Sequence, residues 1–240
     1  VVGSDRADPE HPLGVEAVSA HAFAPLERDG TAGSLRGLIG QTKKLVGAVG
    51  ADLGVVFDRA AERLYLIDES GHEIPVEQAL LLFLRLIGSN GRRGKLVFPV
   101  TVTSQVDEIV KGSGLQVIRT RASLSELTKV AAEDGVIFAG AMGGGYVFPD
   151  FLPAYDAMAS LCKLLELLAP VRQPLSALVA ELPRSTLVHR QLPCPWSHKG
   201  AVMRVLTERL KGRDLDLLDG IKVRDRRGWL LEPPDVLAQA

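Results

Sequence analysis

Two carboxylates and two arginines follow a short apolar run in the first third of the chain. The acids are Asp58 and Glu62, and Arg59 and Arg63 lie beside them. Carboxylates on a short loop at the end of a strand can hold a hard cation, because Mg²⁺ prefers oxygen ligands. Surface charges are more often solvated and neutralise one another, and a charged hairpin fits the same residues. The residue types alone favour the hairpin, with a weak metal site as the alternative.

A glycine-rich segment offers a second kind of chemistry. It begins at Gly140 and ends in three successive glycines, Gly143, Gly144 and Gly145. Successive glycines leave backbone amides open and let an anion or a sugar approach closely. The same composition also suits a flexible loop that only turns the chain. Composition weighs the two interpretations evenly, so the loop is a candidate site for a sugar or a phosphate.

Two arginines at the end of a predicted strand are further candidates for binding an anion. Arg119 and Arg121 can contact phosphate through charge-assisted hydrogen bonds, and solvated residues at a strand end are the alternative. Cys194 and His198 are four residues apart, but two ligands do not make a zinc site. The sequence has no glycine-rich phosphate loop followed by Lys-Ser or Lys-Thr.

The bulk composition is that of an ordinary folded protein. Hydrophobic residues make up 46% of the 240 residues and charged residues 24%, and the formal net charge is -1. The balanced charge argues against nucleic acid and against a membrane as partners. The two cysteines indicate no disulfide framework, so we expect a cytoplasmic protein without a secretory signal.

The charged segment has to be positioned by the two apolar runs that flank it. Residues 53–57 and 64–67 are predicted to be short buried strands joined by the charged segment. Apolar residues at helical spacing predict an amphipathic helix over 34–49 and a largely buried helix over 76–87. Residues 15–19 are a further candidate strand in an otherwise irregular lead-in.

The glycine segment and the two arginines belong to a second series of elements, which follows a basic, glycine-punctuated linker at 88–94. Strands and helices alternate in this series, which implies a parallel sheet covered on both faces. The strands are predicted at 95–102, 115–120 and 136–138, and the helices at 104–111, 123–133 and 156–169. Helix caps are predicted at Ser104 or Thr103 and at Ser123.

The last part of the chain predicts a small α+β domain. Its predicted elements are a helix at 175–182, a strand at 186–192, a helix at 198–210 and strands at 220–224 and 229–231. Asp225 to Gly228 joins the final two strands and is a hairpin signal.

The charged segment resembles the metal loop of the α-D-phosphohexomutases, the phosphoglucomutase and phosphomannomutase family. In that family the loop reads Phe-Asp-Gly-Asp-Ala-Asp-Arg, and its three aspartates bind Mg²⁺. Asp58, Glu62 and Arg63 hold their places against that pattern, whereas Arg59 replaces a glycine and Ala60 replaces the middle aspartate. Loss of one carboxylate and gain of a nearby cation imply a degenerate site that binds Mg²⁺ poorly.

Three further motifs match the family in position and depart from it in chemistry. Residues 141–143 read Ala-Met-Gly where the family has a glutamate and a serine that hold sugar hydroxyls. Residues 123–125 lack the basic side chain of the family's second sugar-phosphate loop, although Arg119 and Arg121 persist beside it. Residues 228–235 stand in the place of a phosphate clamp without its arginine, serine or threonine, and their two carboxylates would repel phosphate.

The resemblance implies an α/β fold of phosphohexomutase-like three-layer α/β/α units with mixed, mostly parallel sheets, plus a small C-terminal α+β domain. Family members have four such units, and this chain aligns from within the second. We therefore expect residues 1–88 to be part of the second unit, 89–172 the third and 175–240 a shortened fourth. The first unit, which carries the phosphoserine loop, is expected to be missing, so no catalytic residue is predicted.

The damaged motifs together imply a non-catalytic phosphohexomutase-like module. Such modules occur at the C-terminal end of some bacterial mannose-1-phosphate guanylyltransferases, which implies a regulatory or assembly role beside a nucleotidyltransferase domain or in a homo-oligomer. No cofactor is expected in that case. The degenerate site residues are then Asp58 and Glu62 for a metal, and Arg63, Arg119, Arg121, Gly140, Gly143, Gly144 and Gly145 for a sugar phosphate.

Two alternatives stay open. A divergent, Mg²⁺-dependent phosphomannomutase or phosphoglucomutase would move phosphate on a hexose phosphate, with Asp58 and Glu62 at the metal and the glycine loop at the sugar. A sugar-phosphate sensor would bind without turnover through Arg119, Arg121 and the glycine loop. An upstream serine loop would favour the mutase, and an upstream nucleotidyltransferase signature would favour the module.

Overall fold

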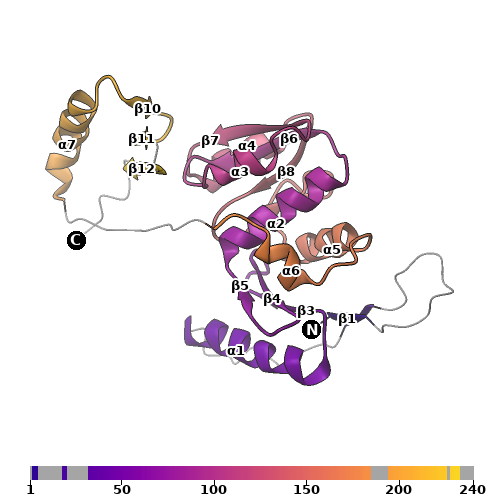
Figure 1. Cartoon of the computed structure of the whole chain (residues 1–240). Coiled ribbons are helices and arrows are strands. Elements are labelled where there is room, and N and C mark those ends of the chain that lie inside the picture. Colours follow the sequence, from indigo (N-terminus) through magenta and orange to yellow (C-terminus); the bar gives the residue numbers. More distant parts are fainter. Residues whose placement is uncertain (1, 5–17, 21–31, 185–193, 226–227, 233–240) are drawn as a thin grey trace.

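The computed structural model describes residues 2–4, 18–20, 32–184, 194–225 and 228–232, and within them the chain forms seven helices and three sheets (Figure 1). The predicted strand at 186–192 and most of the one at 15–19 lie outside these ranges. Every helix inside them is too short or too polar to span a lipid bilayer.

The first sheet has the strand order β2-β1-β3-β4-β5, and its neighbouring strands are antiparallel. It comprises β1 (Val2–Ser4), β2 (Val18–Ala20), β3 (Leu53–Phe57), β4 (Leu64–Asp68) and β5 (Glu73–Ile74), with the helix α1 (Ala32–Val49) against it. β3 and β4 pair in register from Leu53 opposite Asp68 to Phe57 opposite Leu64. The charged segment 58–63 is therefore the connection of a β-hairpin, as the two apolar runs predict.

α1 covers one face of this sheet through a small apolar cluster. Ile39 and Val46 of α1 pack with Val56 of β3 and Ile67 of β4. The helix approaches closely at Gly54, where a Cβ would lie 2.6 Å from Val46 Cγ2. Glycine at position 54 therefore allows α1 to pack closely against the face of the β3–β4 hairpin.

The second sheet, called the parallel sheet below, has the strand order β7-β6-β8-β9. It comprises β6 (Gly94–Pro99), β7 (Leu115–Thr120), β8 (Val136–Gly140) and β9 (Tyr146–Val147), with α3 (Gln105–Ile109) and α4 (Leu124–Ala131) in its connections. β6 is parallel to β7 and to β8, whereas β9 runs antiparallel to β8. A mixed, mostly parallel sheet between helices confirms the predicted α/β fold. The carboxyl ends of β6, β7 and β8 meet at one edge, where open α/β sheets bind ligands.

Alternating side chains of the parallel sheet serve two apolar layers. Leu96, Phe98 and Phe138 belong to the large core that contains α2 (Val76–Ser89), and Val97 and Ala139 pack in a separate cluster with α4. This division confirms the expectation of a sheet covered on both faces.

The helix α2 is buried on nearly all sides and lies between the first sheet and the parallel sheet (Figure 1). One apolar cluster extends from Leu64 of the first sheet through α2 to Phe98 of the parallel sheet. The helices packed against α2 are α3, α5 (Ala157–Leu168) and α6 (Leu175–Ala180). The two sheets thus share one core across the linker at 88–94, and the division of the chain into domains stays a prediction.

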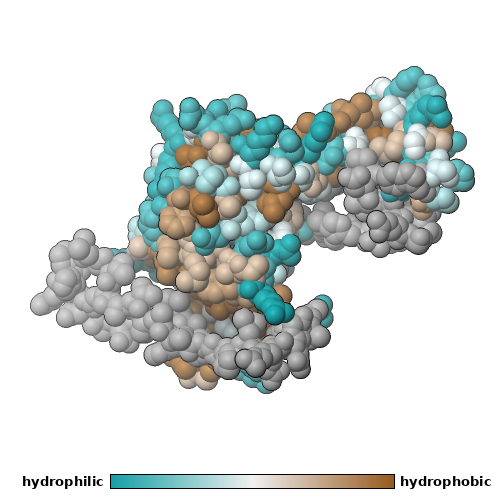
Figure 2. Space-filling model, turned by 180° about the vertical axis from the view of Figure 1, so that it is seen from behind, coloured by the Kyte–Doolittle hydropathy of each residue, from teal (hydrophilic) through white to brown (hydrophobic). Residues whose placement is uncertain are grey.

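The third sheet has the antiparallel order β10-β11-β12 and belongs to the small α+β unit that the sequence predicts. This C-terminal unit, residues 194–225 and 228–232, comprises α7 (Trp196–Arg209), β10 (Asp214–Asp216), β11 (Ile221–Asp225) and β12 (Gly228–Glu232). α7 packs against β11. The unit lies beside the parallel sheet and apart from the first sheet (Figure 1), and it projects from the rest of the molecule when seen from behind (Figure 2).

Several short elements and boundaries differ from the sequence-based expectation. β5, β9 and β10 have only two or three residues each, too few for alternation to show in a sequence. β6 ends at Pro99 rather than at 102, because the chain turns there and the Val102 N–H donates to the Pro99 carbonyl (3.0 Å).

Both predicted helix caps are confirmed, the one at α3 by Thr103, the second of its two candidates. Ser123 Oγ accepts a hydrogen bond from the Glu126 N–H at the start of α4, as predicted. Ser104 makes no side-chain cap bond at α3, where Thr103 Oγ1 instead accepts from the Gln105 N–H (3.3 Å).

Candidate functional site

The charged segment folds around one carboxylate. Asp58 Oδ1 accepts hydrogen bonds from the backbone N–H groups of Glu62 (2.8 Å) and Arg63 (3.0 Å). The Asp58 N–H donates to the Arg63 carbonyl (3.1 Å), and the Ala61 N–H donates to the Asp58 carbonyl (3.0 Å). Ala61 has a φ of 54°, a left-handed conformation that disfavours a side chain. The Asp58 carboxylate thus stabilises the turn of the hairpin, which includes Ala61 in its strained conformation.

The glycine loop, residues 140–145, lies directly against this hairpin. The Leu64 N–H donates to the Gly144 carbonyl (3.0 Å), and Arg63 forms an antiparallel bridge with Gly145. Gly144 has a φ of +83°, and a Cβ there would lie 3.0 Å from the Leu64 carbonyl oxygen. A Cβ on Gly145 would lie 2.8 Å from the ring of Tyr155. Close packing therefore explains the glycines at 144 and 145 without a bound ligand.

The other two predicted glycines differ from each other. A Cβ on Gly140 would lie 2.9 Å from Leu80 Cδ1, so this glycine also serves close packing. A Cβ on Gly143 would meet the Arg63 guanidinium carbon at 3.9 Å, which is an ordinary contact. Gly143 is thus the predicted loop glycine with room for a side chain.

Tyr155 is a member of this site that the sequence analysis does not identify. Its half-buried ring lies against Gly145, and burial raises the pKa of its phenol. Two neighbouring charges act on the same pKa in opposite directions, Arg63 lowering it and Glu62 raising it. A single tyrosine in a loop gives little signal in a sequence, since most tyrosines serve packing.

The residues present do not fit a resident Mg²⁺ ion. Among the residues that the structure describes, no group of three or more His, Cys, Asp or Glu side chains is placed to hold a metal. The hairpin offers two carboxylates, and one oxygen of Asp58 is engaged by backbone N–H groups. Mg²⁺ needs oxygen ligands in near-octahedral geometry, usually one or two carboxylates together with waters and substrate phosphates. No chemical step at this site is therefore assigned to a metal.

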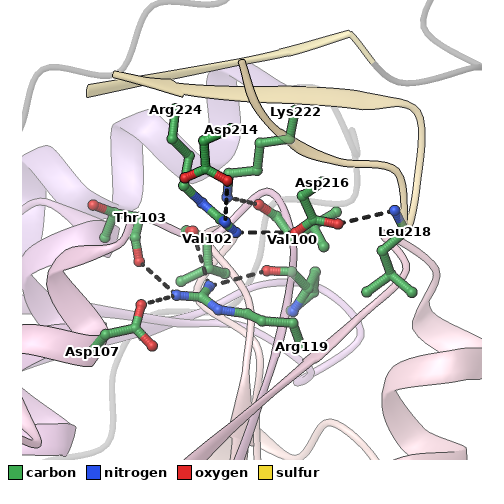
Figure 3. A network of polar contacts seen from close by, with 11 residues as sticks. Val100, Val102, Thr103, Asp107, Arg119, Asp214, Asp216, Leu218, Lys222 and Arg224 are labelled. Carbon is green, nitrogen blue, oxygen red and sulfur yellow. Dashed lines mark hydrogen bonds and ion pairs between the residues drawn. The ribbon is translucent and has the colours of Figure 1, made fainter. Parts of the chain in front are cut away.

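The guanidinium of Arg119 binds groups in the turn that follows β6 and in α3 (Figure 3). Its Nη1 donates to the carbonyls of Val102 (3.0 Å) and Pro99 (3.5 Å), and its Nη2 donates to the carbonyl of Thr103 (3.4 Å). Nη2 also pairs with Asp107 Oδ2 at 2.5 Å. Because both terminal nitrogens are engaged, Arg119 stabilises the turn after β6 and has little capacity left for a phosphate.

Arg121 lines a cavity of about 460 Å³ between the parallel sheet and the C-terminal unit. Glu126 and Asp219 contribute two carboxylates to the same cavity, and Asp219 Oδ2 accepts a hydrogen bond from the Ala122 N–H (2.7 Å). Its other lining residues are Ser123, Leu218 and Gly220. One arginine against two carboxylates does not favour a phosphate dianion there.

The predicted site residues thus fall into two groups at the carboxyl edge of the parallel strands. Asp58, Glu62 and Arg63 meet the glycine loop after β8. Arg119 and Arg121 lie at the end of β7 and face the C-terminal unit. The fold brings the hairpin to the glycine loop and the end of β7 to the C-terminal unit. Two of the predicted polar side chains, Asp58 and Arg119, bind groups of the protein itself.

Comparisons with known proteins bear on the family and the fold of the chain. Residues 76–186 match the family model for phosphoglucomutase/phosphomannomutase, alpha/beta/alpha domain III. A "Probable phosphoglucosamine mutase" of Methanopyrus kandleri is 32% identical over 193 residues, covering 80% of this chain and 43% of that protein. A phosphoglucomutase/phosphomannomutase of Thermococcus kodakarensis is 30% identical over 190 residues, covering 78% and 41%. A Burkholderia thailandensis phosphoglucomutase/phosphomannomutase family protein of known structure has a TM-score of 0.70 at 23% identity, covering 83% and 43%.

The chain belongs to the α-D-phosphohexomutase family, as the resemblance predicts. It spans less than half the length of the relatives that it matches. The matched domain begins at residue 76, which is the first residue of α2. A solved Aspergillus fumigatus N-acetylphosphoglucosamine mutase contains GlcNAc-6P and magnesium, but at a TM-score of 0.44 this bears on that protein alone.

Proposed function

We propose that this chain is a non-catalytic phosphohexomutase-like module. The observation that carries the proposal is the Asp58 carboxylate, one oxygen of which is taken by the N–H groups of Glu62 and Arg63. Ala60 stands where the family resemblance places a second acid, so the hairpin has the shape of a metal loop without enough ligands.

The sugar side of the site supports the same proposal. Met142 packs against the apolar core, and Ala141 beside it has no polar group to offer a sugar hydroxyl. Gly144 and Gly145 are explained by contacts with Leu64 and Tyr155. The loop keeps the backbone of a sugar-binding loop and lacks the side chains that would bind.

The role that we propose is regulatory or assembly, in a cytoplasmic protein that makes nucleotide sugars. The module would sit beside a nucleotidyltransferase domain of the mannose-1-phosphate guanylyltransferase kind, or would join copies of the chain in a homo-oligomer. The C-terminal unit supports this role, because β12 ends at Glu232 where the family resemblance places a phosphate clamp. A carboxylate at that position opposes phosphate binding.

The direct test is an assay for interconversion of the 1- and 6-phosphates of mannose, glucose and glucosamine with Mg²⁺. It should be run on this chain and on the product of its complete reading frame. We expect turnover indistinguishable from buffer in both cases. Turnover by either preparation would contradict the proposal.

A gain-of-function variant sharpens the test of the metal loop. Arg59→Gly with Ala60→Asp restores the family pattern, and Arg59→Gly alone is the matched control. We expect calorimetry to detect Mg²⁺ binding by the double variant and not by the wild type or the control. Tight Mg²⁺ binding by the wild type would show that Asp58 and Glu62 suffice.

A divergent mutase fragment is the second candidate, and the names of the relatives favour it. At 30–32% identity these are a phosphoglucosamine mutase and a phosphoglucomutase/phosphomannomutase. A sugar-phosphate sensor, which would bind without turnover through Arg119, Arg121 and the glycine loop, is a third candidate. Calorimetry with mannose 1-phosphate and Mg²⁺ tests this third candidate, and no heat at millimolar ligand would remove it.

A further inference from the structure

Among the described residues, the C-terminal unit makes two polar contacts with the carboxyl edge of the parallel sheet, through Asp219 and Lys222. Figure 3 shows the contact of Lys222. Lys222 of β11 donates from Nζ to the carbonyl of Val100, the residue that follows β6 (2.5 Å). Asp219, in the turn before β11, accepts from the N–H of Ala122, two residues after β7 (2.7 Å). Each contact pairs a charged side chain of one unit with a backbone group of the other, so both depend on how the two units sit together.

Lys222 is buried in this contact, with only 3% of its surface exposed. Its Nζ lies 4.2 Å from the ring centroid of Trp229, and its hydrogen bond goes to a neutral carbonyl. The charges that face it are Arg119 from β7, Asp107 from α3, Arg224 from β11, and Asp214 and Asp216 from β10.

The carboxylates around Lys222 are shared with two arginines. Asp107 pairs with Arg119 at 2.5 Å, and Asp216 pairs with Arg224 at 3.0 Å. Asp214 lies 3.8 Å from the same guanidinium of Arg224. Burial, together with Arg119 and Arg224, lowers the pKa of Lys222 from 10.5 to about 8.

We propose that Lys222 and Asp219 form a latch that holds the C-terminal unit on the carboxyl edge of the parallel sheet, and that the latch closes more tightly as Lys222 loses its proton. The neutral amine of Lys222 still has an N–H group to donate to the Val100 carbonyl. Burying it between the two units no longer costs the free energy of desolvating a charge. The closed latch covers the chain after β6 and β7, at the edge where open sheets bind ligands.

The direction of the pH dependence follows from the two pKa values. In the closed state the pKa of Lys222 is about 8. Opening removes the burial and the proximity of Arg119, so the pKa rises toward its ordinary value of 10.5, while Arg224 of the same strand stays nearby. Between about pH 8 and 10.5 the open state therefore binds the proton more tightly. Raising the pH through this window favours the closed state, by about tenfold for each unit by which the two pKa values differ.

Hydrogen exchange at the Ala122 N–H measures opening, because this group donates to Asp219 in the closed state. The measurement uses the full 240-residue chain. After correction for the intrinsic exchange rate, we expect the protection of the Ala122 N–H to rise by roughly tenfold between pH 7.5 and 9.5. Lys222→Met should abolish this rise. The control Lys211→Met, at a lysine whose side chain is 71% exposed in the same unit, should retain it.

A second pair of variants tests the other half of the latch. Asp219→Asn weakens a charge-assisted hydrogen bond and should lower the protection of the Ala122 N–H by roughly tenfold. Glu208→Gln also removes a carboxylate, from an exposed pair with Lys211 on α7, and should change nothing. Equal protection in Asp219→Asn and Glu208→Gln, or a wild-type protection that stays flat or falls with pH, would overturn the latch. The wild-type pH series needs no variant to fold.

Discussion

Asp58 shows how a carboxylate in a metal-type loop can serve its own backbone. Alanine at this position removes the acceptor for the Glu62 and Arg63 N–H groups. We expect Asp58→Ala to lose about 1 kcal/mol of unfolding free energy, and Asp58→Asn, which keeps an acceptor oxygen, to lose less. Urea denaturation measures both, with Glu62→Gln as the control.

Magnesium separates this structural role from a role as a ligand. The two variants should respond to millimolar Mg²⁺ as the wild type does, with no shift of the urea midpoint. A midpoint that rises with Mg²⁺ in the wild type and not in Asp58→Asn would identify Asp58 as a metal ligand.

Tyr146 illustrates the opposite case, a polar group with no visible role. Its hydroxyl is buried and has no hydrogen-bond partner within the described residues, and its ring lies 4.6 Å from that of Phe83. An unpaired buried hydroxyl costs about 1–3 kcal/mol. We therefore expect Tyr146→Phe to raise the unfolding free energy at pH 7 by up to about 1 kcal/mol. A less stable Tyr146→Phe would reveal a partner for the hydroxyl.

The same residue predicts a pH dependence of stability. Burial raises the pKa of Tyr146 above its ordinary value of 10.0. The unfolded chain then releases the phenolic proton at a lower pH than the folded chain, so stability falls as the pH rises above about 10. Urea denaturation between pH 8 and 11 should show a smaller fall in Tyr146→Phe than in the wild type.

At the level of elements, the glycine loop connects the two sheets, because it follows β8 and its Gly144 carbonyl accepts a hydrogen bond from Leu64 of β4. Gly144→Ala puts a Cβ 3.0 Å from the Leu64 carbonyl at a φ of +83°. We expect it to cost about 1–3 kcal/mol. Gly143→Ala is the matched control, since its Cβ meets Arg63 at 3.9 Å, and it should change stability by less than about 0.5 kcal/mol. Thermal denaturation of the two variants side by side distinguishes a close-packed connection from an open loop, which would tolerate both.

The elements themselves are largely predictable from the sequence, and their contacts are not. The apolar runs at 53–57 and 64–67 give β3 and β4, because short continuous apolar runs on either side of a charged segment encode two buried strands. Whether a glycine faces a sugar or a tyrosine ring depends on tertiary approach, which no local pattern carries. The latch shows the same limit, since its two hydrogen bonds join residues 97 and 122 positions apart.

At the level of the whole molecule, one core serves two sheets. Phe83 of α2 packs against the rings of Phe138, Tyr146 and Phe148, in the cluster that also contains Leu64. We expect Phe83→Ala to cost about 3–5 kcal/mol and to lower exchange protection in both sheets together. Hydrogen exchange along β3–β4 and β6–β8 measures this.

A control on the C-terminal unit shows whether the effect is specific. Val205 of α7 is 49% exposed, and Val205→Ala should leave both sheets as protected as in the wild type. Loss of protection confined to the parallel sheet in Phe83→Ala would mean that the first sheet has an independent core.

The burial of α2 on nearly every side also determines at which residue a stable truncated form of the protein can begin. A recombinant product that starts at residue 89 would leave the inner face of the parallel sheet, with Phe98 and Phe138, open to water and prone to self-association. A product that starts at residue 76 takes the helix along and keeps that face dry. Gene fusions and rearrangements are expected to respect the same limit, joining foreign sequence ahead of this helix and not behind it.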